Sequence, residues 1–292
     1  MWCLMDEIDD KTGGELMELS PYNQTAIFYN ALKLKNAKIL EEDETGIMIQ
    51  IHDSQTALVL QSNLETAKIW FDKHPPCSFD LISLYGDALC DLFYRIYVMQ
   101  KNCGQNEEKE SGELDRLEPR DKADLINKRD HYANQSDLMS QKTTMLFGKS
   151  KLFVWPENQK AEFGDFSLIF KTAGLSDYSW IRSHYDLVSN EELKEDLEDG
   201  RLFIGYWNGQ PVGFAGIHPE GSMGLLEILP KYRKQGFGKQ MEEYLIQQLV
   251  EHHLAACCEV FCDNFVSIAL QKKLGLKEVS ENCYWIELES ES

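Results

Sequence analysis

The sequence predicts an α/β (α+β) protein with a small domain at residues 1–100 and a larger one at residues 161–292. In the larger domain, short apolar runs typical of strands alternate with amphipathic helical stretches. The smaller domain shows the same alternation over fewer elements. Between them, residues 101–160 begin with a charged stretch poor in large apolar side chains, which is typical of a linker with one or two exposed helices.

Composition limits the class of protein. A chain of 292 residues with 43% hydrophobic residues can fill two modest cores. Its formal net charge of −20 is shared evenly by the two halves, and such a surface repels a phosphate backbone, so we expect no nucleic-acid partner. An acidic surface instead tolerates a cationic partner, such as an amine or a basic peptide.

The expected compartment is the cytoplasm. No apolar run approaches the length of a bilayer span, so no membrane association is expected. The first five residues are followed at once by acids, whereas a secretory signal needs a basic start and a longer apolar stretch. The eight cysteines form no paired C-x-x-C knuckles, which favours buried, reduced thiols over a metal site.

The small domain contains strand-like and helical runs but no recognisable chemical motif. Asp87 is suited to cap the last of its helices, and the acids at 41–44 are expected in a solvated loop. The expected elements are a helix around residues 26–34, strands at 46–51, 56–60 and 79–85, and helices at 65–73 and 87–99.

The larger domain has a sharper pattern. Asn208-Gly209 between two alternating apolar runs predicts a β-hairpin, while Ser176, Asp177 and Asn190 can cap helices. The expected strands are 166–170, 202–207, 212–217, 223–229, 259–262 and 283–288, and two longer helices are expected at 238–254 and 267–274.

The segment 225–240 departs from the acidic character of the chain. Lys231, Arg233, Lys234 and Lys239 bring positive charge to a glycine-containing turn between a predicted strand and a predicted helix. Free N–H groups at a helix start, aided by the helix dipole, bind anions such as a pyrophosphate. The spacing fits neither the nucleotide P-loop nor G-x-G-x-x-G. The alternative interpretation is an ordinary strand–helix turn with a solvated basic face.

This turn carries the first of two motifs that resemble the GNAT superfamily of acyl-CoA-dependent N-acyltransferases. Arg233-x-x-Gly236-x-Gly238 is similar to the family's pyrophosphate motif, Q/R-x-x-G-x-G/A. It also stands in the family's usual place, after a strand that ends at Pro230.

The second motif lies downstream. Asn264-x-x-Ser267 begins a predicted helix that is followed by Lys273-Leu274-Gly275-Leu276, which resembles the family's N-x-x-[AS] helix ending in K-x-G-F. The resemblance runs from about residue 166 onward and implies a mixed central sheet flanked by helices. The layout of the whole chain also resembles the glycine N-acyltransferase-like branch, which would make residues 1–100 a degenerate GNAT-like lobe.

The resemblance implies an acyl-CoA, such as acetyl-CoA, as co-substrate, and no metal. Backbone amides at the turn would hold the pyrophosphate, two strand residues would pair with the pantetheine amides, and an asparagine would lie near the thioester. The residues concerned are Leu226 and Ile228 on the strand, Arg233, Lys234, Gln235, Gly236, Phe237, Gly238 and Lys239 at the turn, and Asn264.

Acyl transfer needs a base, because an amine is protonated near neutral pH. The candidates near the predicted strand are Glu227, Glu220 and His218; each is otherwise a solvated or salt-bridged residue. Glu220 would share a face with Ile228 only if the strand contained no bulge. Many family members carry a tyrosine as general acid seven residues after the motif asparagine, where this chain has Gln271.

The expected function is therefore an enzymatic one. The chain is identified as a candidate N-acyltransferase that transfers an acyl group from acyl-CoA to an unidentified amine, a small molecule or a peptide, by direct attack on the thioester. The alternative is a GNAT-fold module that binds acyl-CoA or recruits a partner without catalysis, and the missing tyrosine favours it.

Overall fold

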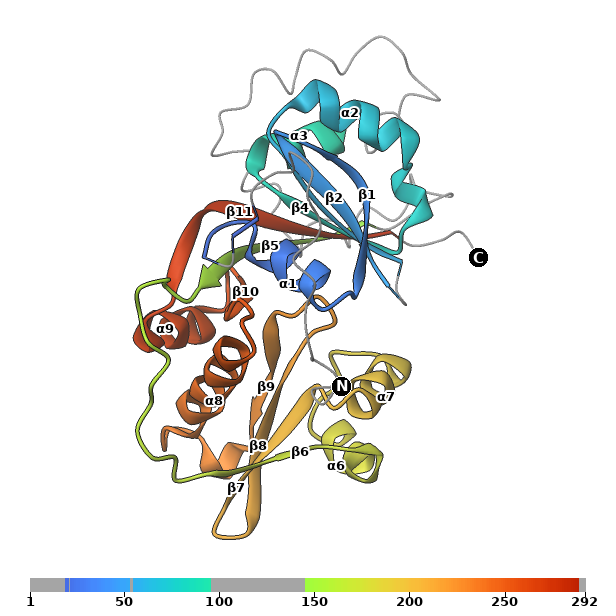
Figure 1. The fold of residues 1–292 in the computed structure, drawn as a ribbon. Helices are drawn as coiled ribbons and strands as arrows, with labels where there is room; N and C mark the ends of the chain where they lie inside the picture. The colour runs from blue at the N-terminus through green and yellow to red at the C-terminus, as the bar shows by residue number, and fades with distance from the viewer. Residues whose placement is uncertain (1–18, 21, 53–54, 96–144, 289–292) are drawn as a thin grey trace.

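The computed structural model describes residues 19–20, 22–52, 55–95 and 145–288 (Figure 1). Within these ranges a seven-stranded sheet has the order β1-β2-β3-β4-β11-β5-β10 and a four-stranded sheet has the order β6-β7-β8-β9. The strands are β1 (Ala37–Asp43), β2 (Gly46–Ile51), β3 (Thr56–Gln61), β4 (Leu81–Tyr85), β5 (Met145–Val154), β6 (Ile169–Thr172), β7 (Leu202–Trp207), β8 (Gln210–Ile217), β9 (Met223–Ile228), β10 (Cys257–Phe261) and β11 (Lys277–Leu288). β3 and β4 are parallel and the other paired strands antiparallel, so the predicted mixed α/β class is confirmed.

Helices cover these sheets. They are α1 (Ala26–Lys33), α2 (Leu64–Lys73), α3 (Asp87–Phe93), α6 (Tyr178–Arg182), α7 (Asn190–Glu198), α8 (Phe237–Glu251) and α9 (Phe265–Leu274), with 3₁₀ turns at Pro76–Ser78, Leu175–Asp177 and Pro230–Tyr232. The helix predicted from residue 87 ends at Phe93, and its expected residues 96–99 lie outside the described part of the chain. In the described ranges, no helix combines the length and the apolar character that crossing a membrane requires.

One sheet runs through both predicted domains. β11 pairs with β4 on one side and with β5 on the other, so Cys283 lies opposite both Tyr85 and Ser150. The half-buried Glu259 of β10 accepts hydrogen bonds from the Tyr85 hydroxyl (2.5 Å), the Ser150 hydroxyl (2.7 Å) and the Trp285 indole (2.6 Å). Because these donors come from three other strands, the carboxylate ties residues of the small domain to the larger one. The boundaries 1–100, 101–160 and 161–292 stay a prediction.

The end of the stretch predicted as a linker is a central strand. β5 pairs with β10 and β11, although Lys149, Ser150 and Lys151 interrupt its apolar character. Each of these polar groups has a partner: Lys149 lies 5.5 Å from the centroid of the Tyr284 ring, Ser150 donates to Glu259, and Lys151 lies 3.6 Å from Glu278. The expectation of exposed helices is wrong for residues 145–154, and residues 101–144 lie outside the described ranges.

Two local expectations also need correction. Glu41 belongs to β1 rather than to a solvated loop, and its carboxylate pairs with Lys73 (2.9 Å) and His74 (3.0 Å) of the neighbouring segment. The cap of α7 is Ser189 rather than Asn190, because the Ser189 hydroxyl accepts from the Glu192 amide while the Glu192 carboxylate accepts from the Ser189 amide.

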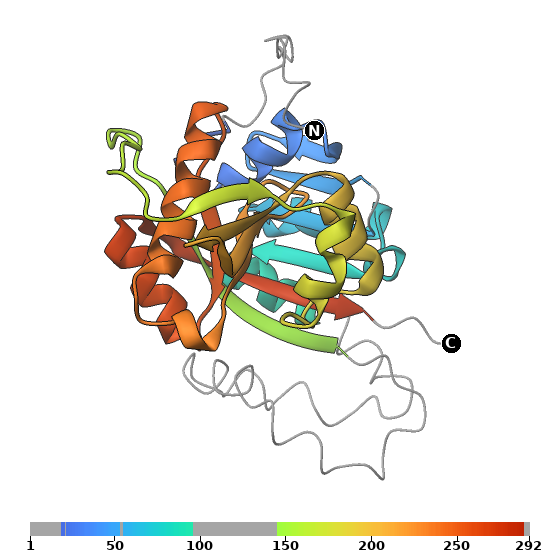
Figure 2. The same cartoon turned by 90° about the horizontal axis from the view of Figure 1, so that it is seen from below.

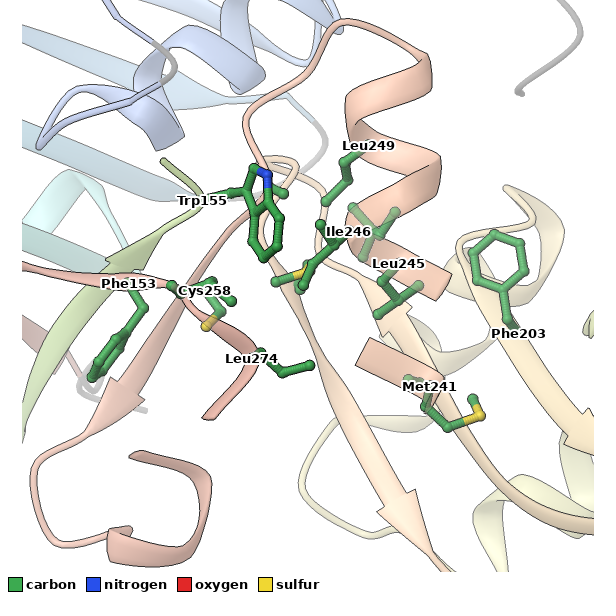
Figure 3. Close-up of a cluster of buried hydrophobic side chains, with 14 of the residues drawn as sticks. Phe153, Trp155, Phe203, Met241, Leu245, Ile246, Leu249, Cys258 and Leu274 are labelled. Carbon is green, nitrogen blue, oxygen red and sulfur yellow. The ribbon is translucent and has the colours of Figure 1, made fainter. Parts of the chain in front are cut away.

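The four-stranded sheet separates two helical layers (Figure 2). α8 and α9 border one apolar core, which includes Met223 and Val212 of the sheet, and α6 and α7 border another, which includes Leu225 and Phe214. In the first core, Met241, Leu245, Ile246 and Leu249 of α8 gather with Trp155, Cys258 and Leu274 (Figure 3). The two faces of β9 are therefore buried against different helices.

One buried side chain of α1, Asn30, contacts the larger domain. Asn30 donates to the carbonyls of Gly221 (2.8 Å) and Ala255 (2.9 Å), and its side-chain oxygen accepts from the Ala255 amide (2.7 Å). Gly221 has a φ of +88°, and a Cβ there would lie 2.7 Å from the Cβ of Asn30. α1 thus fixes the turn between β8 and β9 by a contact that any larger residue at Gly221 would break.

Candidate functional site

The candidate site lies where the two sheets meet. β9 is the last strand of the four-stranded sheet and β10 is the last strand of the seven-stranded sheet. The two strands contact each other, yet they belong to separate ladders. Each therefore keeps an edge whose backbone groups are available to another extended chain. These two edges, of β9 and of β10, are called the β9–β10 opening below; one strand leads into α8 and the other into α9 (Figure 1).

A bulge in β9 re-aims its side chains. Phe214 pairs with Glu227 and Gly216 with Gly224, so Leu225 and Leu226 together face the one residue between Phe214 and Gly216. Leu225 has a φ of +56°, a left-handed conformation that a leucine rarely adopts. The condition for Glu220 and Ile228 to share a face, an unbulged strand, is therefore not met.

The turn after β9 ends in an exposed helix start. Gly236 precedes the fifteen-residue helix α8 with a φ of +85°, and no side chain caps the first N–H groups of that helix. A Cβ on Gly236 would meet nothing within 4 Å, so glycine is needed there for the backbone conformation and the space above the helix start is open. The first turn of α8 carries no acidic residue. These features fit a bound anion such as a pyrophosphate.

The positive charges of the turn are partly used within the protein. Arg233 donates to the Glu227 carboxylate and Lys239 to that of Glu243, while the Lys231 ammonium lies 4.7 Å from the centroid of the Tyr232 ring. In the described ranges, no ion pair is formed by Lys234, which has a φ of +61°. The turn is less electropositive than its sequence indicates, because two of its four cations are paired with carboxylates.

The remaining residues expected around acyl-CoA flank this turn. Gln235 donates to the Lys231 carbonyl (3.2 Å), and Phe237 is buried against Trp207, with 5.7 Å between the ring centroids. A Cβ on Gly238 would lie 3.6 Å from Ile228, so the first turn of α8 sits directly beside β9. Leu226 and Ile228 of β9 are both half-buried against the apolar core that α8 and α9 border.

Asn264 is the N-cap of α9. Its side-chain oxygen accepts from the Ser267 amide (3.1 Å) and so caps α9 at the end of β10. The structure thus places Asn264 at the opposite border of the β9–β10 opening from Gly236, with its side-chain oxygen occupied by the helix cap.

Comparison with known proteins adds the decisive observation. Residues 167–276 match the model of the acetyltransferase (GNAT) family. This segment is a GNAT domain. The match contains β9, the turn, α8, β10 and α9. Among curated proteins, none matches.

Solved structures agree on the fold beyond that segment. A Drosophila protein superposes with a TM-score of 0.56 at 11% identity over 85% of this chain and 75% of its own. A GCN5-related N-acetyltransferase from Kribbella flavida has a TM-score of 0.50 at 11% identity over 91% of this chain and 96% of its own. At this identity the likeness shows the fold alone.

The three candidate bases of the GNAT domain are not gathered at one point. Glu227 and His218 lie on the face of the small sheet that α6 and α7 cover, but roughly 13 Å apart at about 3.3 Å per strand residue. Glu220 is in the β8–β9 turn, where its carboxylate accepts from the Ser222 hydroxyl. Glu227 is the one beside the β9–β10 opening, and it lies near Tyr185.

Tyr185 lies near Glu227, and the sequence does not predict this proximity. Burial raises the pKa of this phenol, and the charges of Asp196, Glu227 and Asp186 add to the effect. It packs edge-on against Phe214, at 5.8 Å between the ring centroids, on the α6–α7 side of the sheet. No sequence signal pairs it with Glu227, because the two are brought together only by packing of the segment after α6 on the sheet.

Gln271 is deeply buried rather than open to the site. It is 1% exposed, and its amide donates to the carboxylate of Glu242 on α8 at 3.2 Å. Glu242 is not among the site residues predicted from the sequence, although its position beside Met241 and one turn before Ile246 places a carboxyl on the apolar face of α8. Among the described residues, no group of His, Cys, Asp and Glu side chains is arranged to hold a metal ion.

Proposed function

We propose that the GNAT domain binds an acyl-CoA, with acetyl-CoA the first to test, and transfers its acyl group to an amine. The observation that carries the proposal is the combination of the uncapped start of α8 with the unpaired edges of β9 and β10 beside it. In this assignment the helix start holds the pyrophosphate and the edge at Leu226 and Ile228 pairs with the pantetheine amides.

Glu227 is the base that this arrangement favours. The ammonium form of the acceptor loses a proton to the Glu227 carboxylate, and the free nitrogen lone pair then attacks the thioester carbonyl carbon. The C–S bond breaks as the amide forms, and the sulfur leaves with the bonding electrons as a thiolate, whose pKa of about 8.5 makes it a fair leaving group. The negative charges of Asp186 and Glu227 both act on Tyr185, and such acidic surroundings favour a cationic acceptor.

Two measurements test the function in sequence. First, the melting temperature of the full chain should rise with acetyl-CoA, since a ligand at a hundredfold over its Kd stabilises by about 2.7 kcal/mol. Second, release of free thiol from acetyl-CoA should appear with members of an amine panel that includes small amines and basic peptides. A folded sample that shows no shift at millimolar acetyl-CoA would refute the proposal.

The second candidate function is a non-catalytic module that binds acyl-CoA or recruits a partner through residues 1–100, which we propose to be a degenerate lobe. Two observations favour it: Gln271 replaces the expected acid and is buried against Glu242, and Glu227 is held by Arg233. A melting shift without thiol release on any amine would select this function over the enzyme.

A further inference from the structure

A buried polar contact joins the two helices that border the proposed acyl-CoA site. Glu242 of α8 is 4% exposed and Gln271 of α9 is 1% exposed, and the Gln271 amide donates to Glu242 Oε1 at 3.2 Å. α8 begins at the proposed pyrophosphate site, and α9 begins at Asn264 across the opening. The separation of the two helix starts therefore depends on how α8 and α9 pack.

The contact is incomplete as long as Glu242 is a carboxylate. Within the described residues, neither Glu242 Oε2 nor Gln271 Oε1 has a hydrogen-bond partner. Both atoms are acceptors, so two acceptors are buried without a donor, and a buried polar group without a partner is destabilising. A single proton on Glu242 Oε2 that is donated to Gln271 Oε1 would satisfy both.

The surroundings favour that proton. Among the described residues, Glu242 forms no ion pair. The cation nearest to it in sequence, Lys239, pairs with Glu243 instead. The titratable group that faces it from β10 is Cys258, whose thiol pKa is raised by burial and then by the Glu242 charge. Burial raises the pKa of Glu242 to about 7, and only the Gln271 hydrogen bond opposes this shift.

We propose that Glu242 and Gln271 form a neutral acid–amide pair, joined by two hydrogen bonds, that fixes α9 against α8 and positions the two helix starts for acyl-CoA. Both are positioning residues rather than catalytic ones. The pair follows from the contact itself, whereas its positioning role rests on the proposed function. Gln271 in this assignment does not occupy a vacant position for a catalytic acid.

The first test follows thermal stability of the full chain between pH 5 and pH 8.5. Wild type should lose stability as pH rises, because the unfolded chain releases the Glu242 proton first. Glu242→Gln replaces the acid with an amide that does not titrate. The variant should therefore lack the loss of stability with rising pH that comes from Glu242, and should melt at or above the wild-type temperature at pH 8.5. Glu251→Gln, which removes an exposed charge from the same helix, should keep the wild-type profile.

An exchange of the two residues sharpens the test. Gln271→Glu alone places two carboxyls together and should melt well below wild type at pH 8.5. The double variant Glu242→Gln with Gln271→Glu again places one acid against one amide, so its pH profile should return to that of wild type. The pair is overturned if Glu242→Gln retains the full decline, if it already melts well below wild type at pH 6, or if the double variant is no better than Gln271→Glu.

The positioning role has its own readout. The Kd of acetyl-CoA, measured by calorimetry, should weaken from pH 6.5 to pH 8.5 by several-fold more in wild type than in Glu242→Gln. Titration of the ligand itself is common to both proteins and cancels in this comparison. If the ratio of the Kd at pH 8.5 to the Kd at pH 6.5 is the same in wild type and in Glu242→Gln, the positioning role is overturned, while the acid–amide pair still stands. If wild type binds no acetyl-CoA at either pH, the proposed function fails, and the stability profiles still decide the pair.

Discussion

Arg233 and Glu227 form an ion pair, with 2.8 Å between Nη2 and Oε1, that joins the proposed phosphate turn to β9. Arg233 also donates from Nε to the Ile228 carbonyl at 2.8 Å. The residue assigned to the anion and the residue assigned to the amine proton are thus in direct contact. Because Arg233 is largely exposed, the pair itself adds little to stability.

Removing the Glu227 carboxylate should affect turnover more than binding. With an acceptor found in the amine panel, Glu227→Gln should lower kcat by about 10²–10⁴-fold, the range for loss of a general base, with the Kd of acetyl-CoA nearly unchanged. The matched comparison is Glu220→Gln, whose carboxylate bonds Ser222 away from the opening. An equal loss in both variants would refute the choice of Glu227.

Gly236→Val should abolish acetyl-CoA binding and leave the fold intact. A left-handed backbone at φ +85° disfavours a β-branched residue by about 1–2 kcal/mol, and the side chain would fill the space above the helix start. Gly209→Val is the control, because it has a similar φ of +75° and equally open surroundings at the β7–β8 hairpin. Calorimetric titration of both variants measures the difference; unimpaired binding by Gly236→Val would disprove the pyrophosphate assignment.

Gln271→Tyr should not create an acid catalyst. The side chain is 1% exposed, so a larger ring overpacks the space between α8 and α9 and leaves Glu242 without its donor. We expect a loss of about 1–3 kcal/mol in the free energy of unfolding, measured with urea. Gln271→Phe should cost a similar amount. A rise in thiol release for the tyrosine variant alone would show that position 271 does face the thioester.

Asn30→Ala should weaken the contact between α1 and the larger domain. It leaves the carbonyls of Gly221 and Ala255 and the Ala255 amide without their partner, and each buried orphan costs about 1–3 kcal/mol. A total loss of roughly 2–4 kcal/mol in urea unfolding is expected. The control is Asn36→Ala, which removes one half-buried bond to the Pro219 carbonyl; a comparable loss there would contradict a special role for Asn30.

Stability should depend on pH through Glu242. Its pKa is raised in the fold from 4.5 to about 7, so the stabilisation is fully present below pH 4.5 and is lost as pH rises toward 7. At about 1.4 kcal/mol per pKa unit, the free energy of unfolding should fall by roughly 3 kcal/mol over this range. Urea denaturation of wild type and Glu242→Gln at each pH isolates the contribution. A pH-independent difference between the two proteins would contradict it.

The sequence by itself determined the order of most elements and the location of the candidate site. Apolar periodicity and capping residues act over a few positions, so the hairpin at Asn208-Gly209, β9, α8 and α9 are readable locally. The turn at Gly236 is readable for the same reason, since its backbone conformation requires glycine. The first strand expected in the larger domain, 166–170, lies instead at Ile169–Thr172, because local periodicity defines the ends of an element less sharply than its existence.

Only the tertiary structure decided which distant groups meet. β5 is a strand because β10 and β11 pair with it and supply partners for its lysines and serine. Its own residue pattern does not predict a strand. The bulge at Leu225 separates Glu220 from the face of Ile228, and two cations of the turn are neutralised by Glu227 and Glu243. In the sequence, Gln271 stands where many family members have a catalytic tyrosine, but in the structure it is buried and bonded to Glu242. A local segment cannot show this, because burial and contacts between distant residues arise only when the whole chain packs.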